Sequence, residues 1–200
     1  APTVSASAKP VNGGVFEIGK SQSVTAVDVN ITMGSAGVKK VEVFDVDTSL
    51  GVLTSGIKAG VNTMTLTKAL TVTAAKQLTV KVTDNEDKVV TAKTGSFSFV
   101  SPYYWGAVAA GVTATESVIK AATKVVQGKG NKSFVYNSNN QRMLIAYPKS
   151  YGAVAKILDA NSFDVTGTFV QTTVQVDGVD YYAYLNDPST VAAFKMSFNY

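Results

Sequence analysis

The chain has 200 residues, 46% of them hydrophobic, and a formal net charge of +4, which is enough apolar content for one domain of common size or two small ones. It contains no cysteine and no histidine, which excludes disulfide scaffolds, thiolate chemistry, histidine metal ligands and Ser-His triads. The basic residues are scattered singly rather than clustered with aromatic side chains, so nucleic-acid binding is not expected, and neither a membrane span nor a signal peptide is predicted.

Residues 1–101 show an alternation of apolar and polar side chains with a period of two, which is typical of strands that bury one face. Short runs rich in glycine, asparagine, aspartate and serine separate these strands and indicate turns. The predicted strands cover 23–32, 38–47, 62–67, 77–84 and 88–100, and the predicted turns cover 12–14, 33–37, 49–51, 58–60 and 84–87.

Short strands at a spacing of roughly ten residues are typical of an antiparallel sandwich, so we predict an immunoglobulin-like β-sandwich for residues 1–101. Val41, Val43 and Phe44 are expected in its core. The cysteine pair and the tryptophan that mark antibody domains are missing from this half, so the prediction depends on strand spacing alone.

Residues 102–200 have the mixed pattern of a small α+β domain with one amphipathic helix. The helix is predicted over 113–130, where Thr113 and Glu116 fit a capping box and Gly128 fits a C-terminal stop. Apolar residues at helical spacing form its predicted buried stripe, which comprises Val118, Ile119, Ala122, Val125 and Val126.

The rest of this half predicts a small antiparallel sheet. The predicted strands cover 132–137, 142–148, 168–176, 180–186 and 192–200. Hairpin turns are predicted at 137–140 and 176–179, and the Asp-Gly pair of the second turn is the stronger signal. Residues 151–159 are ambiguous between a short helix and a strand that follows a loop.

All nine tyrosines and the single tryptophan lie at or after Tyr103, whereas charge is distributed similarly over the two halves. Because Pro102 cannot continue a strand ladder, we expect a domain boundary near Ser101–Gly106, between domains 1–101 and 102–200. Two interpretations of the aromatic run at this boundary stay open: it packs the two domains together, or it forms a patch that faces a partner. The run comprises Tyr103, Tyr104 and Trp105.

No active site, cofactor site or metal site is predicted. The closest acids, Asp84, Glu86 and Asp87, lack the spacing of a calcium loop and are interpreted as a solvated hairpin turn in preference to a calcium site. The glycine- and lysine-rich stretch 127–132 follows a predicted helix, whereas a phosphate-binding loop precedes one. The remaining acids are dispersed over caps and turns, and no catalytic pair stands out.

Three stretches of the second half resemble a module of bacteriophage virion proteins, such as tail-fibre, baseplate and head-decoration proteins. They are YYWG (103–106), NQRMLIAYPKSYGAVAKILDANSFDVTGTF (140–169) and YYAYLNDPSTVAAFKMSFNY (181–200). In those proteins an immunoglobulin-like domain rich in threonine and valine often precedes a domain with the AYPKSYG motif, which lies at 146–152 here. The resemblance covers most of residues 97–200 and the first half more loosely, and it brings no catalytic residues with it.

The resemblance implies a non-enzymatic structural protein located in the virion, as a compact component appended to the head, neck or tail. Such a component would stabilise the particle or aid host adhesion. Its expected partners are other virion proteins, in a homo-oligomer or symmetric assembly, and a host surface. The alternative is a bacterial cell-surface adhesin or carbohydrate-binding module, which predicts a flat row of exposed aromatic side chains. An enzyme is the weakest hypothesis.

The tyrosines lead to a prediction about assembly. A phenol hydroxyl needs water or a partner, and nine tyrosines exceed what a core of this size requires. Tyr181 and Tyr182 are adjacent in a predicted strand, so their side chains must point to opposite faces. We therefore predict that the second domain carries the main subunit contact, with one of this pair and the run 103–105 as interface candidates. Tyrosine packing inside a monomer remains the competing interpretation.

Overall fold

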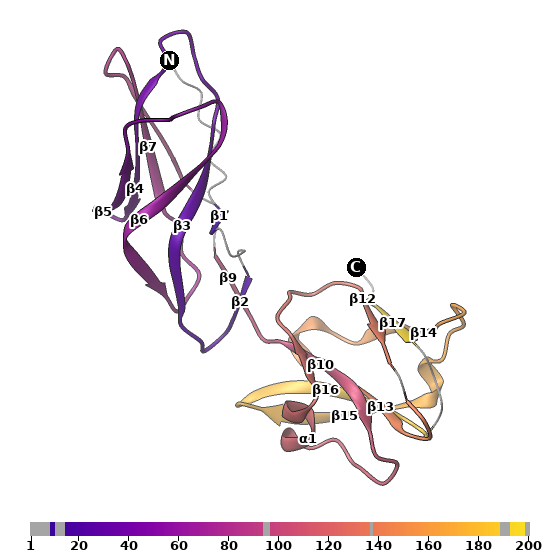
Figure 1. The fold of residues 1–200 in the computed structure, drawn as a ribbon. Coiled ribbons are helices and arrows are strands. Elements are labelled where there is room, and N and C mark those ends of the chain that lie inside the picture. Colours follow the sequence, from indigo (N-terminus) through magenta and orange to yellow (C-terminus); the bar gives the residue numbers. More distant parts are fainter. Residues whose placement is uncertain (1–8, 11–14, 94–96, 137, 189–192, 199–200) are drawn as a thin grey trace. The chain divides into compact units, whose positions relative to one another are not determined.

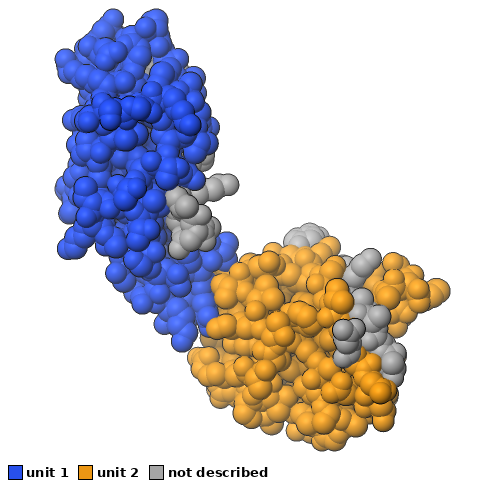
Figure 2. All heavy atoms as spheres, viewed as in Figure 1, with its two compact units in different colours: residues 1–99 blue, residues 100–200 orange. Residues whose placement is uncertain are grey.

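The computed structural model describes residues 9–10, 15–93, 97–136, 138–188 and 193–198 (Figure 1). The chain divides into two compact units, residues 1–99 and 100–200, which Figure 2 shows in two colours. The predicted division was at 101/102. The predicted class is confirmed: the protein is mainly β, with several antiparallel sheets and one α-helix. The turn predicted at 12–14 lies outside the described residues.

The described residues of unit 1 (residues 1–99) form nine strands in three sheets, of which the two larger are antiparallel. A three-stranded sheet has the order β1-β3-β6, a four-stranded sheet has the order β5-β4-β7-β8, and β2 pairs with β9. The strands are β1 Lys9–Pro10, β2 Val15–Glu17, β3 Gln22–Ile31, β4 Val38–Asp45, β5 Thr48–Leu53, β6 Gly60–Val72, β7 Thr79–Asp84, β8 Val89–Lys93 and β9 Ser98–Val100. Of β9, residue 100 falls to the second unit.

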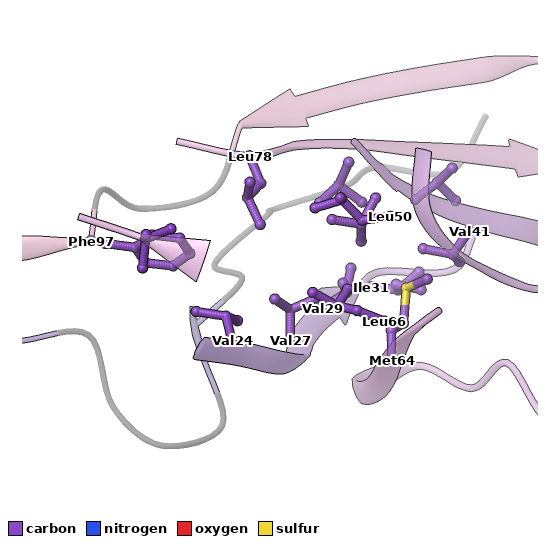
Figure 3. Packing of buried hydrophobic residues seen from close by; sticks show 14 of the residues in the cluster. Val24, Val27, Val29, Ile31, Val41, Leu50, Met64, Leu66, Leu78 and Phe97 are labelled. Carbon is purple, nitrogen blue, oxygen red and sulfur yellow. The ribbon is translucent and has the colours of Figure 1, made fainter. Parts of the chain in front are cut away.

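The core of unit 1 lies between its two larger sheets and is almost entirely aliphatic (Figure 3). Alternate residues of β3 point inward, so Val27, Val29 and Ile31 are buried while the residues between them are not. Val41 and Val43 of the opposite sheet meet them, as the alternation predicted. Phe44, also expected in the core, is only half-buried. The finer assignment of this unit to the immunoglobulin-like type stays a prediction.

The turn expected at 49–51 is wrong, because these residues belong to strand β5. The chain reverses earlier, where Val46 adopts a positive φ of 54°. Gly51 is in the strand because β6 passes close to it: a Cβ at this position would lie 3.1 Å from the Thr65 carbonyl oxygen. The sequence pattern could not separate a glycine that permits close packing from one that permits a turn.

Unit 2 (residues 100–200) contains a five-stranded antiparallel sheet of order β11-β10-β13-β16-β15 and a three-stranded sheet of order β12-β17-β14. The strands are β10 Tyr103–Val108, β11 Thr123–Val125, β12 Lys132–Val135, β13 Arg142–Pro148, β14 Val154–Asp159, β15 Phe169–Val176, β16 Val179–Asn186 and β17 Ala193–Phe198. One α-helix, α1 Glu116–Ala121, and two 3-10 turns, η1 Lys149–Tyr151 and η2 Thr166–Thr168, complete the unit. The ambiguous segment 151–159 contains strand β14.

Both faces of the five-stranded sheet are covered at its central strand. The central strand β13 is buried at every position from Met143 to Pro148, as a strand between two layers must be. Its odd-numbered residues face a cluster that includes Phe134 of β12 and Ile157 of β14, and its even-numbered residues face a cluster that includes Ile119 of α1. Unit 2 is therefore layered as small sheet, central sheet and helix.

The long helix predicted over 113–130 is wrong in extent, since α1 has six residues. Its N-cap is Thr115, whose hydroxyl accepts a hydrogen bond from the Val118 backbone N–H at 3.4 Å, and not the predicted Thr113. After Ala121 the chain becomes strand β11 and pairs with β10, with Val125 opposite Tyr103. The β-branched residues at 123–126 have a low helix propensity, and the available sheet edge decides their conformation.

The Asp-Gly hairpin predicted at 176–179 is present between β15 and β16. Asp177 and Gly178 both adopt positive φ angles, of 48° and 78°, which is the conformation of a type I′ turn. The turn fixes the register of eight consecutive residue pairs between the two strands, from Val176 opposite Val179 to Phe169 opposite Asn186.

Candidate interaction surface

The aromatic run at 103–105 forms the first half of strand β10, inside the second unit. Its side chains alternate across the central sheet: Tyr103 and Trp105 face the small sheet, and Tyr104 faces the helix layer. Tyr103 and Tyr104 are 0% and 4% exposed, and Trp105 is half-buried. The Trp105 ring lies 5.5 Å from the ring of Phe134.

The adjacent pair on β16 also alternates, as an extended strand requires. Tyr181 is 2% exposed and packs with its ring 5.9 Å from that of Tyr104, under the helix layer. Tyr182 points to the other face, is half-buried, and lies with its ring 6.1 Å from that of Tyr147.

The interface prediction is therefore corrected for three of its five residues. Tyr103, Tyr104 and Tyr181 are enclosed by other residues of their own unit, so their rings are not accessible to a partner. The competing interpretation, tyrosine packing inside a monomer, describes these three side chains. Only Trp105 and Tyr182 keep part of their surface accessible.

The hydroxyl groups of two buried tyrosines donate to backbone carbonyls within unit 2. The Tyr136 hydroxyl donates to the Leu144 carbonyl and the Tyr181 hydroxyl to the Pro102 carbonyl, both at 3.0 Å. Burial raises the pKa of Tyr136 far above its ordinary value, so this hydroxyl remains a donor at physiological pH. A phenol hydroxyl was expected to require exposure, whereas the fold provides internal acceptors for the hydroxyl groups of Tyr136 and Tyr181.

A chain of hydroxyl groups leads from the core to the edge of the central sheet. The Tyr147 hydroxyl donates to the Tyr184 hydroxyl at 3.3 Å, and the Tyr184 hydroxyl donates to Gln171 Oε1 at 2.6 Å. The two rings are stacked, with centroids 5.8 Å apart. Burial, followed by the hydrogen bond to Tyr184, raises the pKa of Tyr147 far above its ordinary value. Gln171 is exposed on strand β15, so this series of hydrogen bonds ends at the surface.

The AYPKSYG segment forms the end of β13 and a tight turn. Ala146 and Tyr147 are buried, and the turn ends at Gly152, whose φ of 85° favours glycine. The Lys149 ammonium lies 5.7 Å from the centre of the Tyr182 ring and 3.9 Å from Asp180 Oδ2. The exposed residues of this motif are Lys149, Ser150 and Gly152, and Lys149 lies beside Tyr182.

The acidic turn of unit 1 is a hairpin between β7 and β8. Asp84 is fully buried, and its Oδ1 accepts hydrogen bonds from the backbone N–H groups of Glu86 and Lys88, both at 2.9 Å. Asp87 pairs with Lys39 at 2.5 Å, and Glu86 pairs with Lys88. Each of the three carboxylates is engaged by a hydrogen bond or an ion pair, and the described residues contain no group of three or more acids that could hold a metal ion.

Two polar side chains that stabilise the fold of unit 2 were not predicted from the sequence. Arg142, the single arginine, donates from Nε to the Asn186 carbonyl at 2.7 Å and from Nη1 to the Val112 carbonyl at 3.0 Å. Asn186 is 4% exposed, and its Oδ1 accepts from the Met143 backbone N–H at 2.6 Å. Together they fasten the loop before α1 to the end of the central sheet.

A shallow hollow lies at the start of α1, lined by Thr115, Glu116, Ser117 and Lys120. The Lys120 ammonium donates to Asp177 Oδ1 at 2.5 Å, and this hydrogen bond raises the pKa of Lys120. Glu116 Oε1 accepts from the Asp177 backbone N–H at 2.8 Å. These contacts attach the helix to the hairpin turn, which is a structural role.

No protein-family model, curated protein or solved structure matches this chain. Within the described part of the chain, no helix is long and apolar enough to cross a bilayer.

Proposed function

We propose that this protein is a non-enzymatic structural component of a bacteriophage virion, appended to the head, neck or tail, where it stabilises the particle or aids host adhesion. The proposal is supported by the positions of the three stretches that resemble virion proteins. YYWG begins β10, RMLIAYP is β13, and YYAYLN lies within β16. These three strands are far apart in the sequence and adjacent in the central sheet of unit 2 (Figure 1).

The adjacency matters because a module is a unit that folds around one core. The two resembling strands that flank β13 pair with it residue by residue, with Tyr104 opposite Ala146 and Tyr182 opposite Tyr147. The resemblance therefore follows the core of a compact unit rather than isolated peptides. Two compact β-rich units in one chain are consistent with a structural component of a particle.

The carbohydrate-binding alternative is less well supported by the surface. It predicts a flat row of exposed aromatic side chains, on which sugar rings stack. Among the described aromatic side chains only Phe163 is largely exposed, at 67%, and it lies in the loop between β14 and η2. Trp105 and Tyr182 are each half-buried against the core.

Electron microscopy of purified particles from the native source, labelled with antibodies raised against the chain, tests the proposal. We expect label at symmetric positions on one part of the particle, and peptides of the chain in the mass spectrum of the same preparation. Label on the bacterial envelope, with particles free of the chain, would contradict the virion role and favour the cell-surface adhesin.

A further inference from the structure

The free edge of the central sheet of unit 2 is formed by strand β15, which differs from the other edge strands that the structure describes. An edge strand presents unpaired backbone N–H and C=O groups and can pair with another chain, and proteins usually prevent this with charge, proline, bulges or short length. β15 has eight residues, FVQTTVQV, with no charged residue and no proline. Its pairing with β16 is continuous over all eight residues, without a bulge.

The other described edges are protected. In unit 2, β11 has three residues including Lys124, β12 has four including Lys132, and β14 carries Lys156 at a register shift. In unit 1, β8 has five residues and ends at Lys93, whereas β1 has two and includes a proline. The edges β5 and β6 lie against each other, with the Thr67 hydroxyl donating to the Leu50 carbonyl at 3.0 Å. The two strands of the smallest sheet, β2 and β9, have only three residues each.

We propose that β15 is a homodimerisation edge, which pairs antiparallel with β15 of a second copy so that the two central sheets join into one. The inference goes beyond the virion role and applies to the isolated chain. A second copy is the occupant because the strand is uncharged, so its own sequence approaches it without repulsion. Antiparallel pairing of identical strands has twofold symmetry, which uses both edges and closes the assembly.

The register follows from the hairpin. The two-residue turn makes Val176 and Val179 a hydrogen-bonded pair, and pairs alternate along an antiparallel ladder. The residues whose backbone groups point away from β16 are consequently Gln171, Thr173 and Gln175. Placing Thr173 on the twofold axis aligns these three with the same three residues of the second copy.

In this register the side chains are complementary on both faces. On one face Val170, which is 60% exposed, comes opposite Val176 of the second copy. On the other face Gln171 comes opposite Gln175. Gln171 Oε1 already accepts from Tyr184, which leaves its Nε2 to donate. Gln175 Nε2 donates to Asp180 Oδ1 at 3.4 Å, which leaves its Oε1 to accept, so the two amides match across the interface.

Sedimentation velocity on the full chain over a range of concentrations tests the proposal. We expect a monomer–dimer equilibrium, and we expect Thr173→Lys to weaken the dimer by about tenfold or more, because it opposes two like charges on the axis. Thr91→Lys is the matched control, since it adds the same charge at an exposed position of the edge strand β8 and should leave the equilibrium unchanged. A wild type that is monomeric at millimolar concentration, or a dimer that Thr173→Lys leaves intact, overturns the proposal.

Single cysteines test the register, because the chain has no cysteine of its own. Opposite residues of a hydrogen-bonded pair have Cα atoms about 5.5 Å apart, within the range of a disulfide. Under mild oxidation Thr173→Cys should form covalent dimers, whereas Gln171→Cys should not, because its neighbour across the axis is Gln175. Covalent dimers from Gln171→Cys and none from Thr173→Cys would show that this pairing is wrong.

Discussion

Unit 1 buries valine, leucine, isoleucine, methionine and phenylalanine between its sheets, whereas unit 2 buries tyrosine on both faces of its central sheet. Aliphatic side chains require only apolar surroundings. Buried phenols also require acceptors. The Tyr136 hydroxyl donates to a backbone carbonyl of β13, and the Tyr184 hydroxyl donates to the side-chain amide oxygen of Gln171. The core of unit 2 therefore contains buried tyrosines with hydrogen-bonded hydroxyl groups, and most tyrosines of the chain do not lie on an exposed surface.

The largest difference between the two units is expected in their stability at alkaline pH. Burial raises the pKa values of Tyr136 and Tyr147 above the value of about 10 that tyrosine has in an unfolded chain. The folded state therefore holds these protons more tightly, so the stabilisation is complete below about pH 10 and is lost progressively as the pH rises above it. Unit 1 contains no tyrosine and loses nothing by this route.

We expect unit 2 to unfold in alkali while the strands of unit 1 persist. Trp105 fluorescence reports unit 2 alone, because it is the single tryptophan, and circular dichroism reports both units. Phenolate absorbance should rise cooperatively with the loss of the fluorescence signal. A smooth titration of all tyrosines near pH 10 without unfolding would show that the phenols are not enclosed.

Removing a core side chain from either unit should come next in size. Tyr147→Ala removes a fully buried ring and its hydroxyl contact, and should lower the free energy of unfolding of unit 2 by about 3 to 5 kcal/mol. Leu78→Ala is the matched change in unit 1 and should cost about 2 to 5 kcal/mol there. Urea unfolding followed by Trp105 fluorescence should shift for the first variant only. A shift of equal size for Leu78→Ala would show that the units unfold together.

Removing single hydroxyl groups should lower the free energy of unfolding by less than removing whole side chains. Tyr136→Phe removes the hydrogen bond from the buried hydroxyl to the Leu144 carbonyl and should cost about 1 to 2 kcal/mol. Tyr182→Phe alters a half-buried ring beside Lys149 and should stay within about 0.5 kcal/mol of the wild type. Thermal unfolding of both variants measures the difference, and equal costs would contradict the role assigned to the internal acceptors.

The smallest effect is expected from separating the units. Residues 1–99 and residues 100–200 each have their own core, so each fragment should unfold cooperatively with a midpoint close to that of the same unit in the full chain. Circular dichroism of the two fragments measures this. If the fragment 1–99 shows no cooperative transition, the boundary near residue 100 is not a domain boundary.

The mainly β class and the positions of most strands can be predicted from the sequence, because alternation with a period of two is a local property of the chain. The sequence also predicts the Asp177–Gly178 hairpin, since only a few residue pairs tolerate two consecutive positive φ angles. The bounds of β13 follow from its apolar run and agree with the prediction residue for residue.

The directions of the aromatic side chains and the end of the helix depend on contacts with distant segments. The ring of Tyr104 is buried because Tyr181 packs against it, a contact between segments far apart in the chain that no local pattern encodes. Residues 123–125 form a strand because the edge of β10 is available to them, which overrides the helical spacing of Val118, Ile119 and Ala122. Likewise, Gly51 was predicted to lie in a turn, whereas it lies in strand β5 with the backbone of β6 packed closely against it. In each case the deciding interaction is with a distant segment, whose position the local sequence does not specify.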